Sequence, residues 1–200
     1  FGYYPKSFRS GRFGSSKNII PILSELGYKV DSSIVPFTTK FFKGLYINNW
    51  GRPLEPYWEY FEGNTILQVP VSLINRDYNK LPFFLKKGLG EPNSIAMRLA
   101  KKLGYSMKTE WLRPYKVSGK EMIGIADYII NSHFKKEDHA IVNIMFHSNE
   151  ILVNGSPYCK SDEDVEKYLA SLEELFNYIS QNYKLCSTGL GDVSTIYSQN

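Results

Sequence analysis

Three residues of this chain carry side chains suited to acid–base or charge-stabilising chemistry. His147 follows the apolar run that begins near residue 139, Asp31 ends a shorter β-type run, and Arg9 lies in a Gly/Ser-rich stretch. A histidine can transfer protons near neutral pH. In folds of alternating strands and helices, polar residues at the carboxyl ends of strands gather where the chemistry takes place. We therefore expect these residues to come together at one end of the fold, where the strands have their carboxyl ends. Each of them taken alone is more often a structural residue.

The apolar pattern predicts the elements that would position these side chains. Helical spacing marks four segments: 17–26, 93–103, 119–134 and 161–182. β-type runs mark four others: 27–33, 66–74, 109–115 and 139–148. Residues 36–64 are rich in Gly and Pro and are predicted to form a loop. The alternation of strands and helices predicts an α/β fold with parallel strands.

Composition excludes several classes of protein. The chain has 200 residues and a net charge of +4, and its lysine pairs are scattered, which argues against a nucleic-acid interface. No apolar run approaches the roughly 20 residues of a membrane span. Cys159 and Cys186 form no metal-binding or disulfide pattern. The chain begins at Phe1 rather than at a methionine, so we expect a cut end. Its first residues lack the apolar region of a secretory signal, and the location stays open between cytoplasm and cell envelope.

Three motifs, in order along the chain, resemble the polysaccharide deacetylase family with the NodB homology domain. They are RSGRFGSSKNIIPILSELGYKVDSSIVP, MFHSNEILVNGSPY and the helix DVEKYLASLEELFNYI. The segments ILQVPVSLI and WLRPY extend the resemblance over nearly the whole chain. It is strongest to a subgroup of deacetylase-like proteins often found near bacterial surface-polysaccharide genes. The resemblance implies a distorted (β/α) barrel with fewer strands than a complete eight-fold one.

The resemblance also implies a role for each of the three residues. Arg9 matches the arginine that orients the catalytic base, Asp31 matches the acid that tunes the catalytic histidine, and His147 matches that histidine, the general acid. These roles fit the chemistry, because a carboxylate raises the pKa of a nearby imidazole and keeps it protonated. A guanidinium in turn can hold a carboxylate with two hydrogen bonds.

Two family motifs have no counterpart in this sequence. The base aspartate and the two metal-binding histidines of the family precede the arginine motif, and only eight residues precede Arg9. His133 and His139 do not replace them, since His139 lies about 26 Å along the predicted strand from His147. We therefore expect the ligands of a divalent metal, usually zinc, to lie upstream. Residues 1–200 would form a single deacetylase-like domain without its N-terminal strands, either as a fragment or as a truncated relative without catalysis.

Aromatic residues supply candidates for substrate binding. Trp50 and Trp58 lie in the aromatic-rich segment 41–63, and Trp111 follows in a predicted strand. They could stack on sugar rings, while packing of a long covering loop is the plainer explanation. Glu150 is expected to face solvent or a loop amide rather than act as an additional acid.

The function predicted from the sequence is a metal-dependent hydrolase that removes acetyl groups from a surface polysaccharide or glycan. This chain would supply the general-acid half of the site, and an acetylated glycan would be its partner. The alternative is a carbohydrate-binding or scaffolding remnant of the same fold without chemistry. A weaker third possibility is an unrelated α/β domain that binds a small molecule.

Overall fold

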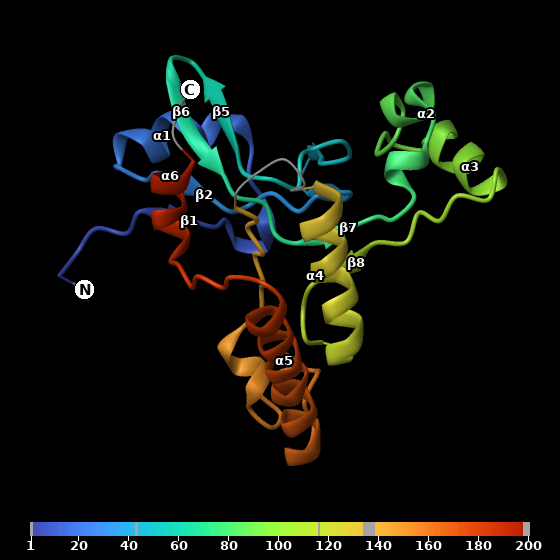
Figure 1. The fold of residues 1–200 in the computed structure, drawn as a ribbon. Helices are drawn as coiled ribbons and strands as arrows, with labels where there is room; N and C mark the ends of the chain where they lie inside the picture. Colours follow the sequence, from blue (N-terminus) through green and yellow to red (C-terminus); the bar gives the residue numbers. More distant parts are fainter. Residues whose placement is uncertain (1, 43, 116, 134–138, 198–200) are drawn as a thin grey trace. The chain divides into compact units, whose positions relative to one another are not determined.

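The computed structural model describes residues 2–42, 44–115, 117–133 and 139–197. The chain forms two compact units, the first made of residues 1–110 and 188–200 and the second of residues 111–187. Each is described by itself below. Figure 1 shows the course of the chain and the labels of its helices and strands.

The first unit contains most of the strands. They are β1 (Ser7–Phe8), β2 (Val30–Asp31), β3 (Thr39–Phe42), β4 (Leu45–Asn48), β5 (Tyr57–Phe61), β6 (Asn64–Gln68) and β7 (Leu73–Ile74), and β8 (Glu110–Trp111) begins at its end. Its α-helices are α1 (Ile20–Glu25), α2 (Phe83–Lys87), α3 (Ile95–Lys102) and α6 (Val193–Ile196). The helices predicted at 17–26 and 93–103 are confirmed, and Ser94 caps α3 by accepting the Met97 N–H at 2.9 Å.

A mixed sheet of four strands, in the order β1-β2-β6-β5, forms the centre of the first unit. Strands β1, β2 and β6 run parallel, with Asp31 in register between Phe8 and Gln68, while β5 is antiparallel to β6. Helix α1 packs against β6 through an apolar cluster of Ile20, Leu23 and Ile66. Because the parallel strands end at the same edge, this register places the Asp31 carboxyl at the carboxyl edge of the sheet.

The prediction of a loop over residues 36–64 is wrong. Strands β3 and β4 pair as an antiparallel hairpin, and β5 and β6 form a second one. Glu62 and Gly63 link the second hairpin, with φ of 49° and 74°. A two-residue turn with positive φ at both positions matches the twist of the strands it joins. The Gly and Pro residues that indicated a loop therefore mark turns between aromatic-rich strands.

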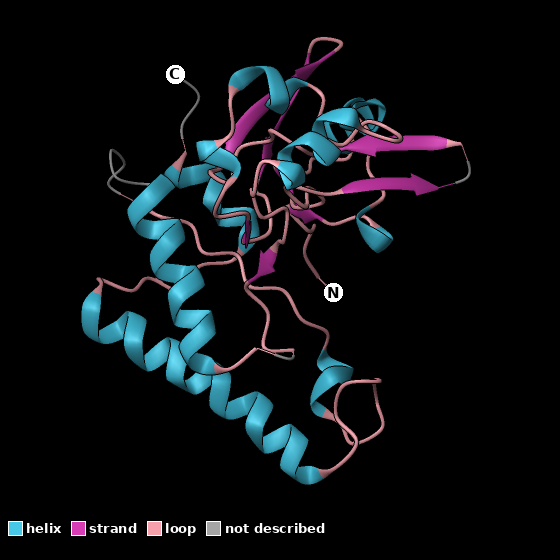
Figure 2. Ribbon diagram, turned by 90° about the vertical axis from the view of Figure 1, so that its right-hand side faces the viewer, coloured by secondary structure: helices cyan, strands magenta, loops and turns pink. Residues whose placement is uncertain are grey.

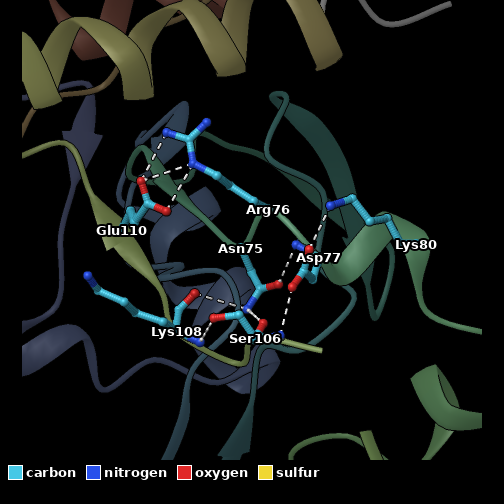
Figure 3. A network of polar contacts seen from close by, with 7 residues as sticks. All are labelled: Asn75, Arg76, Asp77, Lys80, Ser106, Lys108 and Glu110. Carbon is cyan, nitrogen blue, oxygen red and sulfur yellow. Dashed lines mark hydrogen bonds and ion pairs between the residues drawn. The ribbon is translucent and has the colours of Figure 1, made fainter. Parts of the chain in front are cut away.

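A polar network holds residues 106–110 to the segment that follows β7 (Figure 3). The buried Asn75 amide donates to the carbonyls of Ser106 and Lys108, at 3.2 and 3.1 Å. The Asp77 carboxylate accepts the Ser106 N–H at 2.7 Å, and Arg76 makes a bidentate ion pair with Glu110. These contacts hold in place the residues that lead into β8, the strand that pairs with β7.

The second unit is built around two long helices, α4 (Gly119–His133) and α5 (Asp162–Asn182), which pack together (Figure 2). The predicted helix at 161–182 is confirmed. Its N-terminus carries a capping box, in which the Ser161 and Asp164 side chains each accept the other residue's backbone N–H. The helix predicted at 119–134 is confirmed as far as His133, and residue 134 lies outside the described residues.

The strand predicted at 139–148 is not formed. Residues 139–147 adopt neither helix nor strand, and Ser148 begins a 3-10 helix, Ser148–Ile151. Asn143 and Met145 are buried at alternate positions, as in a strand. The segment thus has the burial pattern of a strand, while no β-ladder joins it to another strand in the part of the chain that the structure describes.

The observed architecture is mixed α/β, with a sheet that combines parallel and antiparallel strands. Closure into the barrel that the family resemblance implies stays a prediction. Among the described residues, no helix combines the length and the apolar character needed to cross a membrane.

Candidate functional site

Asp31 is the centre of a buried polar cluster in the first unit. Its side chain is 1% exposed. Oδ1 accepts the Ser33 N–H at 2.9 Å and the Ser33 hydroxyl at 2.5 Å. Oδ2 accepts longer bonds, both at 3.4 Å, from the Ser15 hydroxyl and the Gln68 amide. The carboxyl is therefore held in one orientation by donors from three separate segments.

Arg9 lies beside this cluster, directly after β1. Its guanidinium donates to the Ser32 carbonyl at 3.1 Å and to the Ser32 hydroxyl at 2.7 Å. The neighbouring Ser10 N–H donates to the Ser33 hydroxyl at 2.8 Å. Residues 9–10 and 31–33 are thus bound to each other at the ends of two parallel strands, as the sequence predicted for Arg9 and Asp31.

Burial shifts the pKa of both charged groups toward their neutral forms. It raises the pKa of Asp31 above its ordinary value, and the hydrogen bonds from Ser33, Gln68 and Ser15 oppose that shift. It lowers the pKa of Arg9, whereas the charge of Asp31 acts to raise it. Perturbed pKa values cluster at functional sites, which makes this pair a candidate for one.

His147 lies in the second unit, at the start of the 3-10 helix. It is exposed, its backbone is extended, and its carbonyl accepts the Glu150 N–H at 2.9 Å. The structure brings Arg9 and Asp31 together in the first unit. The meeting of His147 with that pair stays a prediction.

Glu150, three residues after His147, does not face solvent as expected. Its side chain is 1% exposed, and it forms an ion pair with Arg113 and accepts the Tyr168 hydroxyl at 2.8 Å. Burial, followed by the hydrogen bond and the charge of Glu150, raises the pKa of Tyr168 well above its ordinary range. A buried carboxylate with an arginine and a tyrosine as partners anchors the short helix that follows His147. Nothing in the sequence marks this set, because its members are 18 and 37 residues from Glu150.

The three tryptophans lie in different surroundings. Trp50 packs in an aromatic cluster with Phe37 and Tyr78, at ring-centroid distances of 5.8 and 6.3 Å. Trp58 is half-buried on β5, opposite Leu67 of β6. The Arg113 guanidinium lies over the Trp111 ring, 5.6 Å from its centroid. The geometry of Trp50 fits the packing alternative, and a role in sugar binding stays a prediction for all three.

Metal ligands do not gather in the part of the chain that the structure describes. Among those residues, no group of three or more His, Cys, Asp or Glu side chains is placed to hold a metal ion. Cys159 is buried, burial raises the pKa of its thiol, and Cys186 is exposed. The donor set that zinc requires is therefore not formed by these residues.

Comparisons with protein-family models, with curated proteins and with solved structures found no match.

Proposed function

We propose that this chain forms part of the active site of a carbohydrate deacetylase, a hydrolase that removes acetyl groups from a surface polysaccharide or glycan. The proposal rests on the family resemblance of the motifs around Arg9, Asp31 and His147. The observation that carries it is the buried cluster in which Arg9 and Asp31 are linked through Ser32 and Ser33 at the ends of parallel strands.

Asp31 is chemically suited to stabilise a cationic partner. The donors described above are neutral groups, and Arg9 provides a positive charge nearby. An imidazolium placed beside this desolvated carboxylate would favour its ionised form, and the carboxylate would raise the pKa of the imidazole in return. We assign this place to His147, which would donate its proton to the leaving nitrogen or oxygen as the bond to the acetyl carbon breaks.

Among the described residues, no group of three or more His, Cys, Asp or Glu side chains is placed to hold the metal expected for this reaction. In the family that the chain resembles, the metal ligands and the catalytic base lie in motifs that precede the arginine motif. The chain's own contribution would be the acid His147 and the pair Arg9 and Asp31, which positions and tunes the charge around it.

Acetate release from acetylated oligosaccharides tests this function. It is measured, with added divalent metal, on a polypeptide that joins this chain to the proposed base and metal ligands. Replacing the general acid, His147→Ala, should lower the rate by about 10²–10⁴-fold with an unchanged thermal unfolding midpoint. His139→Ala, at another exposed histidine of the same unit, is the matched control and should retain full activity. Undiminished acetate release by His147→Ala would show that His147 is not the acid.

Carbohydrate binding without hydrolysis is the second candidate. It is favoured by a polar pocket beside Asp31, lined in part by Ser15 and Gln68. A protein that binds glycans in this pocket and releases no acetate under any metal condition would support this candidate over the deacetylase.

A further inference from the structure

A polar pocket of about 230 Å³ lies within the first unit, next to the buried acid. Residues that line it include Ser15, Lys17, Asn49, Arg52, Glu59 and Gln68. Ser15 and Gln68 both donate to Asp31, so they separate the carboxyl from the pocket. Sites that enclose drug-sized ligands measure roughly 300–1,000 Å³. The smaller volume here suits one small polar unit, such as a single sugar residue.

Gln68 gives the pocket a buried acceptor that needs a donor. The side chain is 2% exposed, and its Nε2 donates to Asp31. This bond determines which end of the amide faces Asp31, because a carboxylate accepts from the NH₂ group and repels the amide oxygen. Oε1 is buried and has no hydrogen-bond partner among the described residues. A buried carbonyl is almost always paired. Because this oxygen is fully buried, a ligand hydroxyl in the pocket would restore the bond after a small shift of the Gln68 side chain.

Asn49 adds a second polar group at the pocket wall. The residue is 3% exposed, and its backbone is bonded to Phe37, Thr38 and Arg52. These bonds hold the residue in place and leave the side-chain amide for other partners. An amide provides both donors and an acceptor, which suits the hydroxyl groups of a sugar.

The charges at the pocket are unequal. Glu59, 7% exposed, pairs with the Arg52 guanidinium at 2.8 Å and with the Lys17 ammonium at 3.5 Å. Two cations thus surround the one carboxylate of the pocket wall, while the Asp31 carboxyl lies behind Ser15 and Gln68. The bonds to Glu59 and to the Tyr57 hydroxyl use Nη1 of Arg52. Further N–H groups of the guanidinium can therefore bind a second carboxylate, for which its planar fork is well suited.

We propose that this pocket binds a carboxylate-bearing sugar residue, a glycuronate, of the glycan. The sugar carboxylate would accept from Arg52 and Lys17, and a ring hydroxyl would donate to Gln68 Oε1. The link to an acetylated glycan rests on the proposed function, whereas binding of the acidic sugar rests on the pocket alone.

Paired ligands that differ only at one carbon test the inference directly. Methyl β-D-glucuronide and methyl β-D-glucoside share the ring, and the first carries a carboxylate where the second has a hydroxymethyl group. The purified protein should bind the glucuronide about tenfold more tightly, because hydrogen bonds to charged groups are stronger than those between neutral groups. Titration calorimetry or ligand-observed NMR gives both Kd values.

Variants locate the preference in the pocket. Arg52→Gln should reduce the ratio of the two Kd values to near one. Since it leaves Glu59 with one cation, Lys17→Gln serves as a second variant at a half-exposed side chain, and it should lower the ratio severalfold. Gln68→Met should weaken both sugars equally. Arg98→Gln, at an exposed arginine of α3, is the matched control and should change neither Kd.

Each contrary outcome overturns the inference. Equal affinity for the two sugars, or a preference for the glucoside, would mean that the pocket does not select a carboxylate. A preference that survives in both Arg52→Gln and Lys17→Gln would place the acidic sugar elsewhere. Acetate release is not part of the readout, so loss of the sugar preference and loss of deacetylase activity are separate failures.

Discussion

Asp31 in the first unit and Glu150 in the second are both 1% exposed, yet different groups hold them. The Ser33 hydroxyl and N–H, with the Ser15 hydroxyl and the Gln68 amide, donate to Asp31, and all are neutral. Glu150 is paired directly with the Arg113 guanidinium and bonded to the Tyr168 hydroxyl. The first arrangement orients a carboxyl whose pKa is raised, whereas the second neutralises a carboxylate within the core of its unit.

This difference implies different roles for the two carboxyl groups. Asp31 can still gain a cationic partner, whereas Glu150 contributes to the stability of the fold. A desolvated carboxyl held by neutral donors gains from any cation that approaches it. A buried carboxylate already paired with a guanidinium has that partner, and removing either group leaves an uncompensated charge. We therefore expect changes at Glu150 to act on folding and changes at Asp31 to act on activity.

The largest effect is expected from Arg113→Leu. This change leaves Glu150 buried without its cation, and loss of one partner of a buried ion pair costs about 3–5 kcal/mol. Urea unfolding followed by tryptophan fluorescence would measure the loss, because Trp111 lies under the Arg113 guanidinium. Arg98→Leu, at an exposed arginine, should cost less than about 0.5 kcal/mol.

A double variant sharpens this prediction. Arg113→Leu combined with Glu150→Leu removes both charges, and replacing a buried pair with apolar residues is often close to neutral. The double variant should therefore be more stable than Arg113→Leu alone. If it is less stable, packing of the Arg113 stem over the aromatic rings, rather than charge compensation, dominates.

The second prediction concerns Asp31→Asn, which should lower acetate release by about 10²-fold or more without loss of stability at neutral pH. Because burial raises the pKa of Asp31, the folded state binds its proton more tightly than the unfolded chain does. The wild type therefore loses stability as the pH rises from about 3.9, the ordinary value for aspartate, through the folded-state pKa. Asparagine has no such dependence.

Urea unfolding of both proteins at a series of pH values from 4 to 8 checks this sign. The free energy of unfolding of Asp31→Asn, relative to the wild type, should increase with pH and then reach a plateau. A relative stability that falls over the same range would mean that the folded state stabilises the Asp31 carboxylate rather than its protonated form. The comparison between the two acids would then fail.

The sequence predicts those parts of the fold in which local signals act alone. The helix at 161–182 carries its own cap and apolar stripe, so it forms as expected. The strands β3, β4 and β5 within 36–64 were missed because Gly and Pro mark both loops and tight turns. Only pairing between strands separates the two. At 139–148 the apolar pattern correctly indicates buried positions, but burial by itself does not create a β-ladder.

The site residues too could be predicted only where local position in the sequence determines their place. Arg9 follows β1 and Asp31 ends the parallel strand β2, so their proximity could be inferred from their positions in the sequence. Tertiary packing brings together Arg113, Glu150 and Tyr168, and no regular spacing in the sequence predicts their contact. Arg52 and Glu59 are seven residues apart and pair because Glu59 lies on β5, within the segment that was predicted to be a loop.

The smallest predicted effects compare the loss of one hydroxyl at each acid. Tyr168→Phe removes a 2.8 Å bond to a buried carboxylate and should cost about 1.5–3 kcal/mol, the usual range for hydrogen bonds to charged groups. Ser15→Ala removes a 3.4 Å bond to Asp31 from a half-buried serine and should cost less than about 0.5 kcal/mol. Thermal and urea unfolding of the two variants beside the wild type measure the difference. Equal costs would mean that Asp31 depends on its hydroxyl donors for folding as strongly as Glu150 does, and that the contrast between a responsive and a structural acid lies in their charged partners alone.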